Sequence, residues 1–192
     1  QVERSNDDEA IAGMRGRRGI HIAIAVVVVA AAIAGGAQLL RSMDSQQAYA
    51  TAGEQLERSD TEQGAAFLRC ALPNQQRSQL AAPNALRSAI EIATERMGKT
   101  YAKVLSKCTP LLDNFEQTIG AIKAPPDVAP KVQAVSTAAN SFGAAWLGLR
   151  DRLQSREPDR AEIAPLIDNI IAAWQTYQDE RTRAKQALSA KL

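Results

Sequence analysis

Residues 128–153 read VAPKVQAVSTAANSFGAAWLGLRDRL, and they decide the fold of the chain. The apolar residues of this stretch recur at alternating steps of four and three residues: Val128, Val132, Val135, Ala139, Phe142, Trp146, Leu149 and Leu153. This spacing predicts an amphipathic helix over residues 128–154 that buries one seam against other helices.

Similar seams lie on both sides of this helix, over residues 84–122 and 160–188. The first should be one helix that tolerates Gly98 and bends at Pro110, because proline removes a backbone hydrogen bond. Residues 42–72 supply a fourth helix, with a local break and a fresh cap at residues 59–62. The short connection at 155–159 favours antiparallel packing. We therefore expect an all-α, elongated antiparallel four-helix bundle.

Upstream of the bundle, residues 19–40 read GIHIAIAVVVVAAAIAGGAQLL and carry no acidic or basic side chain apart from one histidine. A helix of about 20 apolar residues spans the hydrocarbon core of a bilayer. We expect one uncleaved transmembrane helix here, between a cytoplasmic tail at 1–18 and the bundle at 41–192. A cleaved signal peptide is the alternative, since residues 32–34 have the small-x-small form of a cleavage site.

Three arginines, Arg15, Arg17 and Arg18, lie directly before this span, whereas only Arg41 lies close behind it. Positive residues favour the cytoplasmic side of a membrane. The arginines therefore determine the predicted topology: a single-pass protein of the bacterial inner membrane, with its bulk in the periplasm.

Within the span, His21 is the only histidine of the chain, and Gly35 and Gly36 are adjacent near the outer end. We expect His21 to reach lipid headgroups or water, with ligation of a chlorin or haem as the alternative. The two glycines would let a helix of another membrane subunit approach closely.

Cys70 and Cys108 both lie on apolar seams, and an even cysteine count in an oxidising compartment favours a disulfide between them. In a simple hairpin, Cys108 would lie about 36 Å along the next helix. The bridge therefore requires residues 71–83 to run extended back along the bundle. Two separate core cysteines are the alternative.

The rest of the chain offers no chemistry that we can recognise. The body lacks a histidine base, a Cys-x-x-Cys pair and a glycine-rich phosphate loop, so we expect no catalytic residue, no cofactor and no metal site. The net charge of +2, with mixed signs along the helices, argues against nucleic acid.

Three seam residues have both a plain and a sharper interpretation. Arg181 should bury its aliphatic stem and keep its guanidinium in water, with an anion site as the alternative. Trp146 and Trp174 should pack together as core aromatics, with a ligand-stacking site as the alternative.

Residues 112–149 combine a helix that ends before Pro125-Pro126 with an amphipathic helix rich in small and aromatic residues. This pattern resembles that of poorly characterised, envelope-located bacterial four-helix-bundle proteins. The resemblance implies an envelope location and a helical bundle, and it carries over no binding residue.

Together these features predict a non-catalytic accessory or structural subunit of a larger membrane protein complex. Its expected partners are the lipid bilayer and other integral membrane subunits. A periplasmic sensor or small-ligand-binding module is the alternative, since helix bundles can hold ligands between their helices.

Overall fold

A computed structural model describes residues 44–73, 75, 82–155 and 159–192, and Gln46–Leu192 forms one compact unit. All regular structure in these ranges is helical, which confirms the expected all-α class. Residues 44–58 are helical and continue without a break into two further segments. The elements that follow are the π-helix η1 (Ser59–Gly64), α2 (Ala65–Ala71), α4 (Pro83–Met97), α5 (Lys99–Gly120), α6 (Ala129–Ser155) and α7 (Arg160–Ser189).

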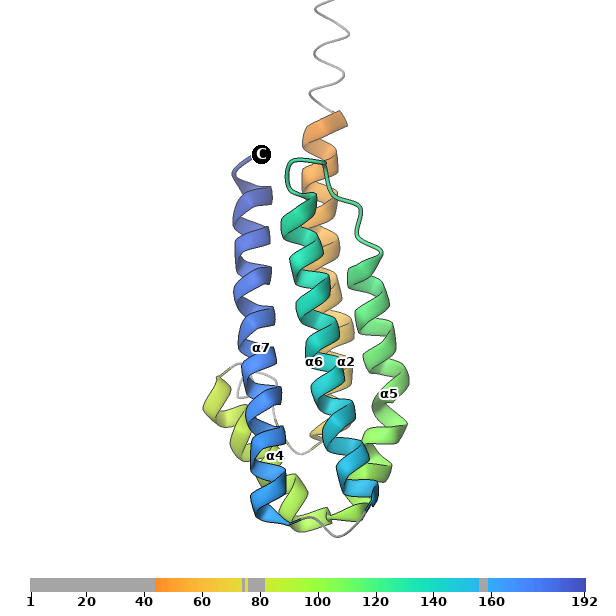
Figure 1. Cartoon of the computed structure of the whole chain (residues 1–192). Helices are drawn as coiled ribbons and strands as arrows, with labels where there is room; N and C mark the ends of the chain where they lie inside the picture. Colours follow the sequence, from red (N-terminus) through yellow and green to blue (C-terminus); the bar gives the residue numbers. More distant parts are fainter. Residues whose placement is uncertain (1–43, 74, 76–81, 156–158) are drawn as a thin grey trace, which may run out of the picture. The chain divides into compact units, whose positions relative to one another are not determined.

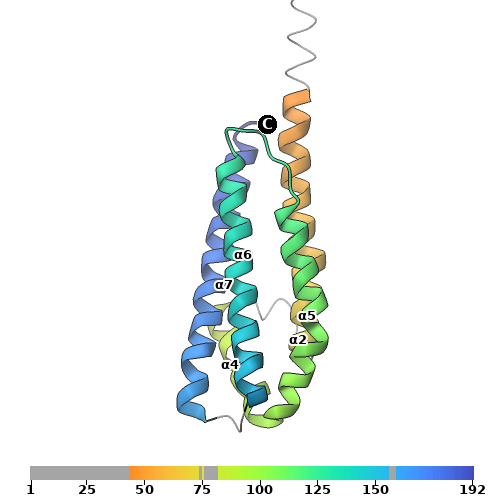
Figure 2. The same ribbon diagram turned by 45° about the vertical axis from the view of Figure 1, so that its right-hand side comes forward.

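The long helices of this unit form an antiparallel bundle (Figure 1). Helix α6 packs against both α5 and α7, and α5 also packs against η1 and α2. Figure 2 shows α6 and α7 as one pair of helices and α2 and α5 as the other. The short helix α4 lies beside α7, at the end of the bundle where α5 begins.

Aromatic side chains fill the middle of the core. Phe67 from the first helix lies 5.3 Å from Trp146 and 6.1 Å from Phe142, measured between ring centroids. Trp174 continues the cluster, stacked on Tyr177 at 5.6 Å. Both tryptophans are buried, as expected for core residues. Such edge-to-face and stacked pairs add stability beyond the area that they bury.

The expected single helix over residues 84–122 is wrong, because the chain reverses at Gly98. Gly98 has a φ of +48° and a ψ of −124°, which side chains with a Cβ rarely adopt. Its backbone N–H still caps α4 by donating to Thr94 O at 2.9 Å. We expected Pro110 to bend its helix without dividing it, and α5 does run through Pro110 as one helix.

The reversal at Gly98 explains how the disulfide forms. Cys70 and Cys108 are bridged, with their Cα atoms 5.7 Å apart, so the predicted pair is present in the structure. Cys108 comes only a few turns after the reversal, and α5 therefore returns past the end of α2. The extended return that we expected for residues 71–83 lies largely outside the described residues, since 74 and 76–81 are not among them.

A polar contact closes the opposite end of the bundle. Asp127, in the connection between α5 and α6, accepts a hydrogen bond from Tyr49 Oη at 2.8 Å. The same carboxylate pairs with Lys191 Nζ at 3.0 Å. These contacts lower the pKa of Asp127, chiefly through the hydrogen bond from Tyr49. Three separate parts of the chain thus meet at one carboxylate.

Among the helices of the described part, none combines the length and apolarity that a membrane crossing requires. The predicted span at 19–40 lies outside the described residues, as do Arg15, Arg17, Arg18, His21, Gly35 and Gly36. The topology and the membrane location therefore stay predictions.

Reducing the disulfide should destabilise the bundle. The bridge closes a loop with a sequence separation of 38 residues. A loop of this length stabilises the folded state by about 4 kcal/mol on the chain-entropy model. Urea unfolding with and without reductant measures the loss, and a double variant, Cys70→Ser with Cys108→Ser, should no longer respond to reductant. A wild-type curve unchanged by reductant would contradict the prediction.

Replacing Gly98 by alanine should destabilise the fold by about 1–2 kcal/mol, because its backbone conformation is strained for any residue with a Cβ. Gly148 in α6 is the matched control, since a Cβ there meets nothing within 4 Å. Gly148→Ala should stabilise by about 0.5–1 kcal/mol through helix propensity. Equal effects of the two substitutions in thermal unfolding would refute this assignment.

Candidate functional site

The most unusual local structure of the bundle is the π-helix η1, within the first long helix. The break and fresh cap expected at residues 59–62 are wrong, because Ser59 Oγ instead donates to Gln55 O at 2.8 Å inside a continuous helix. A π-turn is wider than an α-turn, and such turns often mark functional sites. The first helix also comes close to α5 here, since a Cβ on Gly64 would lie 3.1 Å from the ring of Phe115.

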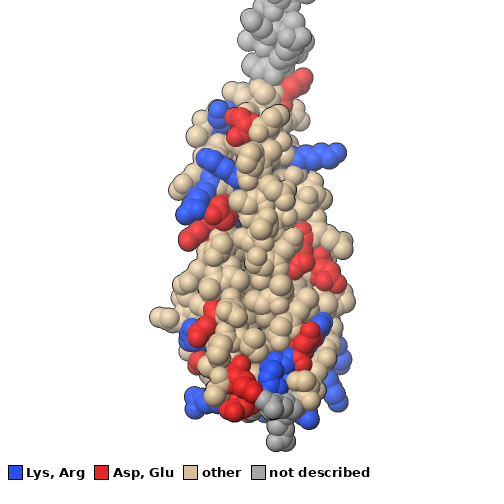
Figure 3. Space-filling view, viewed as in Figure 1, with Lys and Arg blue, Asp and Glu red and all other residues tan. Residues whose placement is uncertain are grey.

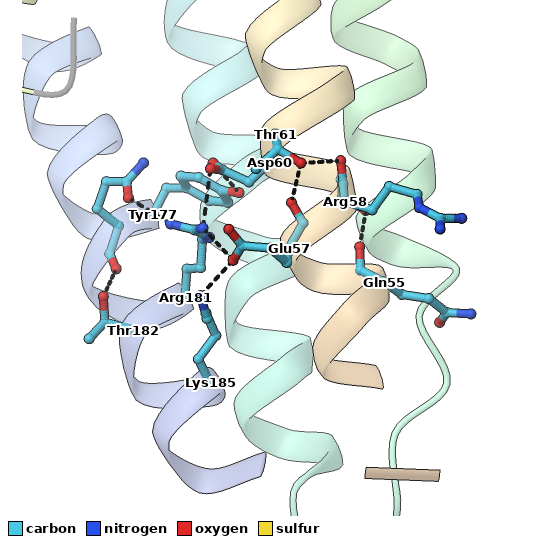
Figure 4. Close-up of polar contacts among 11 residues, drawn as sticks. Gln55, Glu57, Arg58, Asp60, Thr61, Tyr177, Arg181, Thr182 and Lys185 are labelled. Atoms are coloured by element: carbon cyan, nitrogen blue, oxygen red, sulfur yellow. Dashed lines mark hydrogen bonds and ion pairs between the residues drawn. The ribbon is translucent and has the colours of Figure 1, made fainter. Parts of the chain in front are cut away.

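The π-turn places Asp60 inside the bundle, where only 7% of the residue is exposed (Figure 4). Tyr177 Oη donates a hydrogen bond to Asp60 Oδ1 at 3.1 Å. The guanidinium of Arg181 lies 3.2 Å from Asp60 Oδ2. A buried carboxylate requires such partners, because an unpaired buried charge is very costly.

A second carboxylate extends this cluster toward solvent. Arg181 Nη2 also contacts Glu57 Oε2 at 2.9 Å, and Lys185 Nζ lies 2.5 Å from the same oxygen. The hydrogen bond from Lys185 is the largest of the effects that lower the pKa of Glu57. Burial, with the nearby carboxylate of Asp60, raises the pKa of Tyr177 far above its ordinary value. Tyr177 therefore stays protonated and acts as a hydrogen-bond donor.

We refer to Glu57, Asp60, Tyr177, Arg181 and Lys185 as the η1–α7 cluster. It contains two carboxylates and two cations, which neutralise one another across the interface of the two helices. The guanidinium of Arg181 is thus engaged by protein carboxylates. This does not fit either the solvent-exposed head or the anion site considered from the sequence. The arrangement is suited to fixing the register of two helices.

On the other side of η1, a groove of about 440 Å³ runs between the first helix and α5. Its walls are mainly polar, with Gln55, Arg58 and Glu62 on one side and Gln117 on the other. The two walls are joined by the side chains of Asn114 and Gln63, whose amide nitrogen and oxygen lie 2.5 Å apart. The groove has the size to hold a polar ligand, but both of its hydroxyl groups, those of Ser59 and Thr118, already donate to backbone carbonyls of their own helices.

Metal ligation has no evident basis in the described part of the chain, where no three His, Cys, Asp or Glu side chains gather as ligands would. The sulfur atoms of Cys70 and Cys108 are joined in a disulfide, so neither residue offers a thiolate as a metal ligand. Asp159 caps α7 by accepting from Ala161 N at 3.0 Å, and Glu180 pairs with Arg183 at 2.7 Å. Asp159 and Glu180 thus have structural partners.

The sequence indicates one member of this cluster, Arg181, because a charged residue interrupts an apolar seam. Asp60 instead fell within the break expected at residues 59–62, and Glu57 was not singled out. The available signal was that a buried arginine on α7 requires a carboxylate on a facing helix.

Comparison of the chain with protein-family models, with characterised proteins and with solved structures finds no match.

Removing Arg181, the cation that contacts both carboxylates of the cluster, should strongly destabilise the bundle. Arg181→Met removes the guanidinium that pairs with Asp60, and breaking a buried pair in this way costs roughly 3–5 kcal/mol. A second change, Asp60→Asn, should recover part of this loss, because it removes the buried negative charge.

The matched control is Arg183→Met, since that side chain is 65% exposed and pairs with Glu180 of its own helix. It should change the free energy of unfolding by no more than about 0.5 kcal/mol. Urea unfolding of the four proteins measures both effects. Similar losses at residues 181 and 183 would show that the cluster has no special role.

Proposed function

We propose that this chain is a non-catalytic accessory subunit of a larger membrane protein complex. In this proposal the segment at 19–40 anchors it in a bacterial inner membrane, and the bundle lies on the periplasmic side. The single observation that carries the proposal is a broad surface on α6 and α7 that lacks charged side chains.

This surface is visible as the uncharged middle of the face in Figure 3. Helix α6 carries no charged residue between Lys131 and Arg150, and α7 carries none between Asp168 and Asp179. The exposed side chains at this level are small or neutral, and we call them the charge-free belt: Thr137, Asn140, Ser141, Ala144, Ala172, Gln175 and Thr176.

The composition of the belt fits contact with another protein. Nearly a quarter of the whole chain is charged, at 23%, so charges are concentrated away from this surface. Charged residues are depleted in the buried cores of protein interfaces, because their desolvation is costly. Small side chains also let a second helix approach closely. The occupant that we propose is a helix of another subunit of the complex.

The rigidity of the bundle supports the same function. The disulfide and the η1–α7 cluster fix the first helix to α5 and to α7, respectively. Disulfides persist in oxidising compartments, which agrees with a periplasmic location. A rigid body presents a constant surface to its partner, and it therefore loses little conformational entropy on binding.

A second candidate function is a periplasmic sensor or small-ligand-binding module. The polar groove between the first helix and α5 favours it, because this groove lies directly against η1. A ligand there could alter the π-turn, and a rise in melting temperature with a polar ligand would support this candidate.

The accessory function predicts a stable complex that depends on the charge-free belt. The full chain is extracted from its membrane in mild detergent, and the mass and stoichiometry of the purified particle are measured. Wild-type protein should carry other integral membrane subunits in fixed proportion. Ala144→Arg should reduce their recovery about tenfold or more, because it places a large charge in the middle of the contact.

The matched control is Ala190→Arg, at an exposed residue that follows α7 outside the belt. It should leave the complex intact, and circular dichroism should show that both variants are folded. A wild-type particle that contains only this chain would refute the proposal. Equal recovery with both variants would refute the belt as the contact surface.

A further inference from the structure

A second groove lies between α4 and the first turns of α7, whereas the η1–α7 cluster lies farther along α7. Its volume is about 250 Å³, which is below the range of about 300–1,000 Å³ typical for drug-sized ligands. The groove is open because Ala164 is small and Gly98 has no side chain where α4 ends. It therefore has room for one small molecule.

The floor of this groove is apolar. Ile163 and Ile167 project from α7 and are only 4% and 2% exposed. Burying apolar surface of a ligand against such side chains is favourable, at roughly 25 cal/mol per Å². The floor thus selects molecules that are mainly hydrocarbon.

One polar group in the wall stands out. Thr94 lines the groove and is 95% buried, with 5% of its surface exposed, yet its hydroxyl has no hydrogen-bond partner among the described residues. Other helical hydroxyls of this chain donate to the carbonyl four residues earlier, as Ser106 does to Ala102 O and Thr176 to Ala172 O. A buried hydroxyl without a partner is costly. The oxygen is itself covered, so the side chain must turn toward the groove for a ligand atom to pair with it and remove this cost.

The charges at the rim are already paired. Arg160 contacts Glu95 at 3.2 Å, and Glu91 lies 3.9 Å from Arg87. A charged ligand would have to compete with these pairs, whereas a neutral one would not. The Arg160–Glu95 pair is largely exposed, so opening it to admit a ligand costs little.

We propose that the groove between α4 and α7 binds a small, neutral, mainly apolar molecule with one hydrogen-bonding group, which the hydroxyl of Thr94 holds. This site is independent of the charge-free belt and of the accessory function proposed above. It is formed by side chains of two helices, and no catalytic step is attached to it.

The test uses the full chain and two probes of nearly equal shape, indole and indene, of which only indole carries an N–H donor. Binding is followed by the chemical shifts of the Ile163 and Ile167 methyl groups in NMR titrations. Indole should shift both methyl groups in a saturable way. Indene should bind about three- to tenfold more weakly, since it lacks the hydrogen bond to Thr94.

Two substitutions locate the site. Thr94→Val keeps the shape of the side chain and should abolish the preference for indole over indene. Ala164→Phe should fill the groove and abolish binding of both probes. Ala190→Phe, at an exposed alanine that follows α7 outside both the groove and the charge-free belt, is the matched control and should leave indole binding unchanged.

Several results would overturn the proposal. Isoleucine methyl groups that do not respond to either probe at saturation would exclude this site. Indole binding that persists in the folded Ala164→Phe variant would place it elsewhere. A preference for indole that survives Thr94→Val would remove the role of Thr94. If Ala164→Phe does not fold, the response of the two methyl groups in the wild-type protein decides.

Discussion

The backbone conformation of Gly98 is the constraint on which the arrangement of the helices depends. Its positive φ reverses the chain between α4 and α5. Because of that reversal, α4 lies against α7 and α5 returns along the first helix. In a continuous helix, Cys108 would lie about 36 Å from the start of that helix. The bridge to Cys70 and the groove between α4 and α7 both follow from this one residue.

The core of the bundle combines two kinds of interaction that meet at Tyr177. Its ring belongs to the aromatic cluster, 5.6 Å from Trp174 and 5.4 Å from Phe115. Its hydroxyl belongs to the η1–α7 cluster and donates to Asp60. Apolar packing supplies most of the stabilisation, but it tolerates sliding of one helix along another. The buried ion pair does not, because each charge needs its partner at hydrogen-bond distance.

The periodic part of the fold was predictable from the sequence, whereas the local departures were not. The seams around Trp146 and Trp174 predicted α6 and α7 almost to their ends, because a 3.5-residue repeat reports helix packing directly. Gly98 was ambiguous, since glycine occurs both inside and after helices. The π-turn had no local signal, because it is stabilised by Asp60 contacts with residues more than a hundred positions away.

The position of the disulfide also sets how the bundle would respond to mechanical load. A pull on the start of the first helix would first strain the hydrogen bond from Tyr49 to Asp127, and then the contacts of Glu57 and Asp60 with Arg181. These noncovalent contacts can break and reform under tension. Detachment of the first helix would then stop at Cys70, because the disulfide transmits the load to Cys108 in α5. The first helix would therefore detach from the bundle and rejoin it reversibly, but only as far as the disulfide at Cys70.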